Sequence, residues 1–355
     1  MTLGNESASA IIKIVTYKFK EITVLVVDSK PHIITLIRGV LQMFGVQKIY
    51  SASTQEAALE YFEEQKPDLL IVDWEIANSS GISFTRAIRQ SSQNPYVPVI
   101  FMTSFTSEAR VAEARDSGIT EFLAKPFSVE TLYKRIERII EKPRAFVVAP
   151  DYVGPDRRRK KAAPPDGIER RKAEKEKKTK YVPLPQDDVF KNRAKLRKAT
   201  IVTPPNDIKK KIGTGGIDAA DLQAARNYLA ENTVDFKPLG AGLVDALRQV
   251  ARQITDGTIT GEPAIEALLF PAAQLKAQGA LFHYPMVSNI AEILVDFLET
   301  VLDADKDVLD VVDVHAVAIS YVLKIKQADS SHSLDKALEN SLIKACKRYY
   351  ALKGL

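Results

Sequence analysis

In this 355-residue chain, Pro67-Asp68-Leu69-Leu70-Ile71-Val72-Asp73-Trp74 is the segment that most clearly indicates the fold of the first third. Its four consecutive apolar residues, Leu69 to Val72, predict a short strand that is buried on both faces, as in the centre of a parallel sheet. Asp73 follows directly, so we expect its carboxylate at the carboxyl end of that strand. Open α/β sheets bind their ligands at this edge.

Three further apolar runs end in polar residues that belong at the same edge of the sheet. Residues 23–27 precede Asp28, residues 97–102 precede Thr103 and Ser104, and residues 121–124 precede Lys125 and Pro126. Helical patterns separate the runs, including one that starts after Ser128. This alternation over about 120 residues predicts an α/β domain with a doubly wound, flavodoxin-like, five-stranded parallel sheet.

The side chains at this edge suit phosphoryl chemistry. The Asp73 carboxylate can attack a phosphoryl group if a divalent cation and a fixed positive charge offset the negative charge of the oxygens. Asp28 offers an oxygen ligand of the kind that Mg²⁺ prefers. The Lys125 ammonium and the Thr103 hydroxyl can each bind a phosphoryl oxygen. Pro126 disfavours a helical conformation at Lys125, which can direct the lysine into the cleft.

Residues 20–142 resemble the receiver domain of two-component response regulators, on the motifs that end in Asp28, Asp73-Trp74, Thr103-Ser104 and Lys125-Pro126-Phe127. The resemblance implies that Asp73 accepts phosphate and that Thr103 and Lys125 assist it. It also implies a Mg²⁺ site at Asp28, Asp73 and Glu75, the last through its backbone or its side chain, and a switch formed by Thr103 and Phe122. Such a protein signals, and its only catalysis is its own phosphorylation and dephosphorylation.

Two positions depart from the family pattern. Ser29 stands where a second acid usually follows the first strand, and a neutral hydroxyl is a poorer Mg²⁺ ligand, so we expect weakened metal binding. Glu75, two residues beyond Asp73, can lend its carboxylate instead. Phe122 replaces a frequent tyrosine and can swing inward, but it has no hydroxyl for a hydrogen bond. A degenerate receiver that acts without phosphate is therefore an alternative.

A basic, largely disordered linker is predicted between this domain and the rest of the chain. Four regions are expected: an extension at 1–19, the receiver at 20–142, the linker at 143–214 and a helical domain at 215–355. Residues 151–211 hold 20 Lys and Arg against 9 Asp and Glu, a net charge of +11, with little apolar surface to offset the entropy of ordering. The arginine-rich stretch at 150–159 resembles the tail of a group of alphaproteobacterial response regulators.

The single cysteine, Cys346, excludes an intramolecular disulfide and suits a reducing compartment. The chain opens without the charged and apolar segments of a signal peptide, and acidic residues interrupt the apolar segments near residues 308–325. We therefore expect a cytoplasmic protein without a membrane span.

The C-terminal region predicts an all-α bundle of five or six helices, the first capped by Asp218. A short segment resembles the phosphorylated helix of histidine phosphotransfer domains, through Lys276, Gln278 and Gly279. Ala273 stands at the histidine position and cannot accept phosphate, so the resemblance implies a degenerate phosphotransfer-like domain. His283, which precedes Tyr284-Pro285, is interpreted as a structural or surface histidine. The alternative is an active phosphotransfer bundle that uses His283 or another histidine.

The combined prediction is a phosphorelay response regulator that takes phosphate on Asp73 from a histidine kinase or histidine phosphotransfer protein. It would signal to a downstream protein through the receiver and the bundle, and the bundle can dock on its own receiver. One alternative is receiver-gated binding of nucleic acid or an anionic nucleotide by the basic linker, although no aromatic residues for base stacking accompany its arginines. A phosphate-independent scaffold is another.

Overall fold

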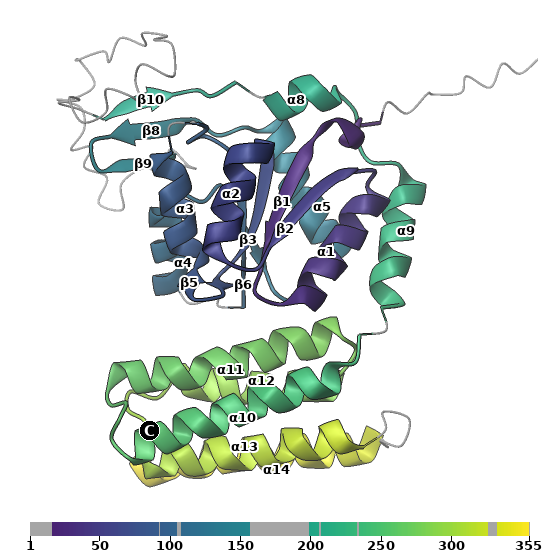
Figure 1. Cartoon of the computed structure of the whole chain (residues 1–355). Coiled ribbons are helices and arrows are strands. Elements are labelled where there is room, and N and C mark those ends of the chain that lie inside the picture. Colours follow the sequence, from purple (N-terminus) through teal and green to yellow (C-terminus); the bar gives the residue numbers. More distant parts are fainter. Residues whose placement is uncertain are drawn as a thin grey trace, which may run out of the picture. The chain divides into compact units, whose positions relative to one another are not determined.

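The computed structural model describes residues 16–91, 93–104, 108–156, 199–205, 207–232, 234–325 and 332–354. The chain divides into two compact units, and the main boundary between them lies between Ala230 and Glu231. The first unit contains the predicted sheet, and the second is built from helices (Figure 1). In the described ranges no helix is long and apolar enough to cross a membrane.

A five-stranded sheet in the order β2-β1-β3-β6-β7 forms the centre of the first unit. Its strands are β1 (Thr23–Val27), β2 (Lys48–Ala52), β3 (Leu69–Asp73), β6 (Val99–Thr103) and β7 (Glu121–Ala124). β1 pairs in parallel with β2 and β3, and β3 pairs in parallel with β6. All five residues of β3 are buried, as expected for a central strand covered on both faces. The predicted sheet is confirmed.

Helices cover both faces of this sheet. They are α1 (Pro31–Met43), α2 (Gln55–Gln65), α3 (Gly81–Gln90), α4 (Glu108–Asp116) and α5 (Val129–Glu141). α1 and α5 lie on one face, and α2, α3 and α4 lie on the other (Figure 1). A 3-10 turn (Phe19–Glu21) precedes β1, and two short strands, β4 (Glu75–Ile76) and β5 (Ser79–Ser80), pair between β3 and α3. This layering is the doubly wound arrangement that the sequence predicts.

Parts of the predicted linker are folded onto the first unit. β8 (Phe146–Ala149), β9 (Tyr152–Pro155) and β10 (Thr200–Val202) form an antiparallel sheet, and α8 (Asp207–Ile212) follows. The prediction of a largely disordered linker is therefore wrong for these residues. The physical reason is a small core of buried apolar side chains, Phe146, Val148, Val153 and Val202. The arginine pairs of residues 157–198 lie outside the described residues.

A buried arginine joins the small sheet to the rest of the unit. Arg89, at the end of α3, donates from Nε to the Gly118 carbonyl oxygen at 2.8 Å. Its Nη1 donates to the carbonyl oxygens of Pro95 at 2.8 Å and Val97 at 2.7 Å. The guanidinium also lies 5.2 Å from the centre of the Phe146 ring in β8. One side chain thus connects α3, the segments before β6 and β7, and the small sheet.

Helix α9 (Ala219–Ala230) belongs to the first unit, although it was predicted to open the bundle. Its amino end is capped as expected, because Asp218 Oδ1 accepts a hydrogen bond from the Ala220 amide at 2.8 Å. The helix packs against α1 and α5. The Tyr228 ring covers Gly39 of α1 so closely that a Cβ atom at Gly39 would overlap it. The absence of a side chain at Gly39 therefore permits this packing.

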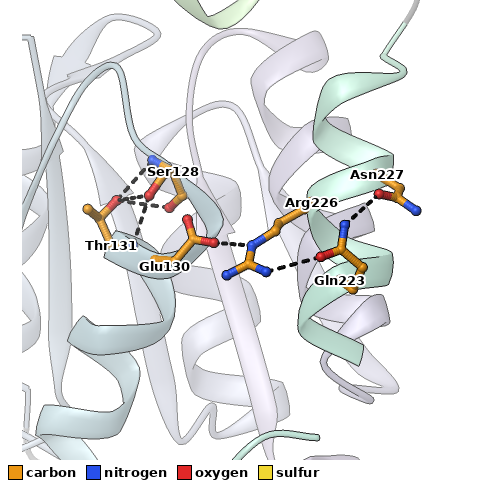
Figure 2. Close-up of polar contacts among 6 residues, drawn as sticks. All are labelled: Ser128, Glu130, Thr131, Gln223, Arg226 and Asn227. Carbon is orange, nitrogen blue, oxygen red and sulfur yellow. Dashed lines mark hydrogen bonds and ion pairs between the residues drawn. The ribbon is translucent and has the colours of Figure 1, made fainter. Parts of the chain in front are cut away.

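Polar contacts also hold α9 against α5. Figure 2 shows the Arg226 guanidinium hydrogen-bonded to Glu130 of α5 and to Gln223 on its own helix. Just before α9, the Ile217 amide donates to the Tyr133 hydroxyl at 3.2 Å. The Arg226 hydrogen bond lowers the pKa of the Glu130 carboxyl. Both charged side chains are partly exposed, so packing of the helix contributes more than this ion pair does.

The second unit is an all-α bundle, as predicted. Its helices are α10 (Phe236–Thr255), α11 (Glu262–Leu281), α12 (Pro285–Leu298), α13 (Lys306–Lys324) and α14 (His332–Lys353). The first four pack in sequence, α13 returns against α10, and α14 packs on α12 and α13. α11 continues through Pro271, which therefore does not start a new helix. Buried residues recur every three or four positions in α12 and α13.

Replacing the buried arginine should destabilise the first unit. Arg89→Met leaves the carbonyl oxygens of Pro95, Val97 and Gly118 without this donor, and we expect the free energy of unfolding to fall by about 3 kcal/mol. Trp74 is the only tryptophan, so urea unfolding followed by its fluorescence reports this unit. Arg86→Met, at an exposed position of the same helix, is the control and should be nearly neutral. Equal stability of the two variants would contradict this role for Arg89.

Adding a methyl group at Gly39 should loosen α9. In Gly39→Ala the Tyr228 ring must move away, and overpacking of this kind costs roughly 1–3 kcal/mol. Hydrogen exchange of the amides at 219–230 should be faster by the factor to which this free-energy cost converts. Gly242→Ala is the matched control, because Gly242 also lies inside a helix but a Cβ there meets nothing within 4 Å. Unchanged protection of α9 in Gly39→Ala would show that the ring is not needed for docking.

Candidate functional site

The register of the sheet brings the two predicted aspartates together. Val27 of β1 pairs with Val72 of β3, so Asp28 and Asp73 are the next residues on neighbouring strands. Adjacent strands lie about 4.8 Å apart. Asp28 is 0% exposed and Asp73 is 1% exposed. Two carboxylates are thus buried next to each other at the carboxyl edge of the sheet.

Thr103 and Lys125 lie at the same edge. Asp73 pairs with Met102, which places Thr103 one residue further along β6. The Lys125 amide donates to the Thr103 carbonyl oxygen at 2.7 Å, so the ends of β6 and β7 are linked. Both side chains are buried, and the Lys125-Pro126 peptide bond is cis. The sheet therefore brings together the four side chains that the sequence predicted as a site.

The start of α5 limits the path of the chain after Lys125. Ser128 Oγ accepts a hydrogen bond from the Thr131 amide at 3.2 Å, and Thr131 Oγ1 accepts one from the Ser128 amide at 2.9 Å (Figure 2). This reciprocal cap begins the helix three residues after the lysine. Glu130, in the first turn, is the residue that Arg226 of α9 contacts. The segment carrying Lys125 is thus held between β7 and a helix that α9 supports.

Aromatic side chains connect the site to β7. Phe101 packs edge to face against Trp74 at 5.5 Å and against Phe122 at 6.4 Å between ring centres. Phe122, the predicted switch residue, is half-buried beside the core. The Arg110 guanidinium lies 5.3 Å from the centre of the Trp74 ring. The Phe101 ring thus lies between Phe122 and Trp74, the residue that follows Asp73.

Lys30 also lies at this edge, although no sequence motif indicated it as a candidate site residue. Its Nζ forms an ion pair with Glu75 Oε2 at 2.7 Å. Its amide nitrogen donates to Asp28 Oδ1 at 2.8 Å, at the start of α1. The only sequence feature that pointed to Lys30 was its position directly after Asp28-Ser29. The Glu75 carboxylate, predicted as a substitute metal ligand, is thus held by an ammonium group.

The two aspartates fit a Mg²⁺ ion. Neighbouring buried carboxylates are costly unless a cation or protons offset their charge, and Mg²⁺ binds through a few carboxylates together with carbonyl and water oxygens. In the part of the chain that the structure describes, no three His, Cys, Asp or Glu side chains gather around one point. Asp28 and Asp73 would therefore supply two carboxylates, and backbone and water oxygens would complete the ligand set.

The residues of the predicted phosphotransfer motif all lie on α11. Ala273 and Gln278 are buried, and Lys276 pairs with Glu292 of α12 at 3.0 Å. A Cβ atom at Gly279 would come within 3.0 Å of the Ser288 amide nitrogen, so this glycine permits close approach of α12. Packing and an ion pair account for Lys276 and Gly279 within the bundle. His283 lies after the helix end with φ of 64°, and its Nε2 is 3.2 Å from Asn232 Nδ2.

Residues 24–137 match the family model of the response regulator receiver domain. The chain is 28% identical over 120 residues to the phosphate regulon transcriptional regulatory protein PhoB of Pseudomonas aeruginosa, a match that covers 34% of this chain and 52% of PhoB. It thus spans about half the length of PhoB. It is 27% identical over 119 residues to the chemotaxis protein CheY of the same organism, covering 34% of this chain and 96% of CheY. Among solved structures, the chemotaxis response regulator CheY4 of Vibrio cholerae is 30% identical, with a TM-score of 0.32, over 33% of this chain and 98% of that one.

Proposed function

Residues 24–137 form a response regulator receiver domain, and from this premise we propose that the chain is a phosphorelay response regulator that accepts phosphate on Asp73. The observation that carries the proposal is the meeting of four buried side chains at one edge of the sheet: Asp28, Asp73, Thr103 and Lys125. A nucleophile, a partner acid, a hydroxyl donor and a cation are the groups that phosphoryl transfer to a carboxylate needs. The donor would be a phosphorylated histidine of a kinase or phosphotransfer protein.

Phosphoryl transfer in this site is chiefly a matter of position and charge. An Asp73 carboxylate oxygen attacks the phosphorus atom, the new P–O bond forms, and the P–N bond to the donor histidine breaks and leaves its electron pair on the imidazole. Lys125 and Thr103 bind oxygens of the transferred group. When bound at Asp28 and Asp73, Mg²⁺ would offset the negative charge on the carboxylate and phosphoryl oxygens.

The phosphorylated state would be transmitted through the ends of β6 and β7. A phosphoryl oxygen on Asp73 draws the Thr103 hydroxyl toward it, and the hydrogen bond between Lys125 and Thr103 links this movement to the strand before α5. α9 packs on α5 and leads within a few residues into α10. Phosphorylation would shift the population of receiver conformations. We propose that the contact between α5 and α9 passes this shift on to the helices that follow α9.

The bundle would serve as a degenerate phosphotransfer-like module that binds a protein partner without relaying phosphate. Ala273 has no group that can carry phosphate, and His283 lies outside α11. The bundle would therefore contribute recognition, and the receiver would contribute the phosphorylation state.

Acetyl phosphate with Mg²⁺ should add one phosphoryl group to the wild-type protein. The intact mass should increase accordingly, and the adduct should be absent from Asp73→Asn because an amide is not a phosphoryl acceptor. Asp116→Asn, at an exposed acid of α4, is the control and should be modified like the wild type. An adduct that persists in Asp73→Asn would contradict the assignment of the acceptor.

The Thr103 hydroxyl should be needed more for the response than for phosphorylation. Thr103→Ala loses the donor to the phosphoryl oxygen, whereas Thr103→Ser keeps it and is the matched control. We expect hydrogen exchange at 128–141 and 219–230 to change on phosphorylation in the wild type and in Thr103→Ser, and to change by less than half as much in Thr103→Ala, since a charge-assisted hydrogen bond contributes about 1.5–3 kcal/mol. Equal changes in all three proteins would exclude this route.

A further inference from the structure

An ion pair crosses the edge of the sheet beside the two aspartates. Lys30 follows β1 by three residues, Glu75 follows β3 by two, and their side chains meet at 2.7 Å. β1 and β3 are neighbours in the sheet, so the pair spans the same two strand ends that carry Asp28 and Asp73. The side chains of Lys30 and Glu75 are 17% and 38% exposed, so the ion pair is partly buried.

Two consequences for a divalent cation follow from this geometry. An ammonium group at the sheet edge that carries Asp28 and Asp73 repels a divalent cation bound there, and its partial burial reduces the screening of this repulsion. The ammonium also holds one oxygen of Glu75, the acid two residues beyond Asp73 that could replace the carboxylate missing at Ser29. Mg²⁺ is therefore opposed by a positive charge and deprived of a third carboxylate.

We propose that Lys30 is a positioning residue that lowers the Mg²⁺ affinity of the site by keeping the Glu75 carboxylate in an ion pair. The inference rests on the proposed function only in taking Asp28 and Asp73 as the metal-binding acids. Loading of the receiver would then depend on the Mg²⁺ concentration, and any event that separates Lys30 from Glu75 would increase metal binding.

The side chain of Lys30 can be changed without removing its backbone contact. The hydrogen bond to Asp28 comes from the amide nitrogen, so it is available to any residue except proline. Lys30→Met keeps an unbranched side chain of similar length and removes the ammonium group. Lys48→Met makes the same change at an exposed lysine at the start of β2, the opposite edge of the sheet, and controls for the loss of net charge.

The test is a Mg²⁺ titration of the unphosphorylated full-length proteins, followed by isothermal calorimetry and by the fluorescence of Trp74. We expect Lys30→Met to bind Mg²⁺ about tenfold more tightly than the wild type, the order of effect of one nearby charge on a divalent ion. Lys48→Met should bind like the wild type. Lys30→Met/Glu75→Gln should lose roughly half of the gain on a logarithmic scale, because the released carboxylate is then absent.

The outcomes separate this inference from the proposed function. Equal affinity of Lys30→Met and the wild type, or no Mg²⁺ binding by Lys30→Met, overturns the inference whether or not acetyl phosphate modifies Asp73. If the double variant keeps the full gain in Mg²⁺ affinity, the role assigned to Glu75 is overturned. Charge repulsion by Lys30 would then account for the whole effect. Failure of phosphorylation in a protein that shows the expected affinities would overturn the proposed function and retain the role of Lys30.

Discussion

The burial of two carboxylates side by side is the constraint on which the rest of the first unit depends. Asp28 and Asp73 follow strands that pair in parallel, so the register of the sheet sets their separation. Burying two acidic groups side by side is costly unless a positive group or hydrogen bonds offset their charge. Lys30 lies at the same edge just before α1, in the segment that carries Asp28, and Lys125 lies there between β7 and the cap of α5.

Helix α9 and the small sheet extend the first unit beyond residues 24–137, the range that matches the receiver family model. The small sheet is anchored through Arg89, which satisfies three carbonyl oxygens and contacts Phe146. α9 is anchored through the space that Gly39 leaves for Tyr228. Segments after residue 142 are thus in direct contact with α1, α3 and α5, the helices whose ends surround the site. The last helix before the bundle in the sequence is α9, which packs against two of these helices, α1 and α5.

Sequence patterns predicted which polar residues end the buried strands, and the sheet brings these residues to one edge. A run of buried residues that ends in a polar side chain is visible without a structure, and parallel strands bring such ends to one edge. Lys30 escaped notice because its partner, Glu75, is 45 residues away and only the pairing of β1 with β3 joins them. The location of α9 escaped notice for the same kind of reason, since an amphipathic helix shows that it packs but not against which surface.

Periodicity and residue type are enough to predict the alternation of strands and helices, the residues at the strand ends and the helical nature of the second unit. Tertiary structure alone decided that residues 146–155 and 200–230 belong with the receiver and that an ammonium holds Glu75. Those outcomes depend on which surfaces meet. A buried apolar stripe or a charged side chain acquires its partner only when segments distant in the chain are packed together.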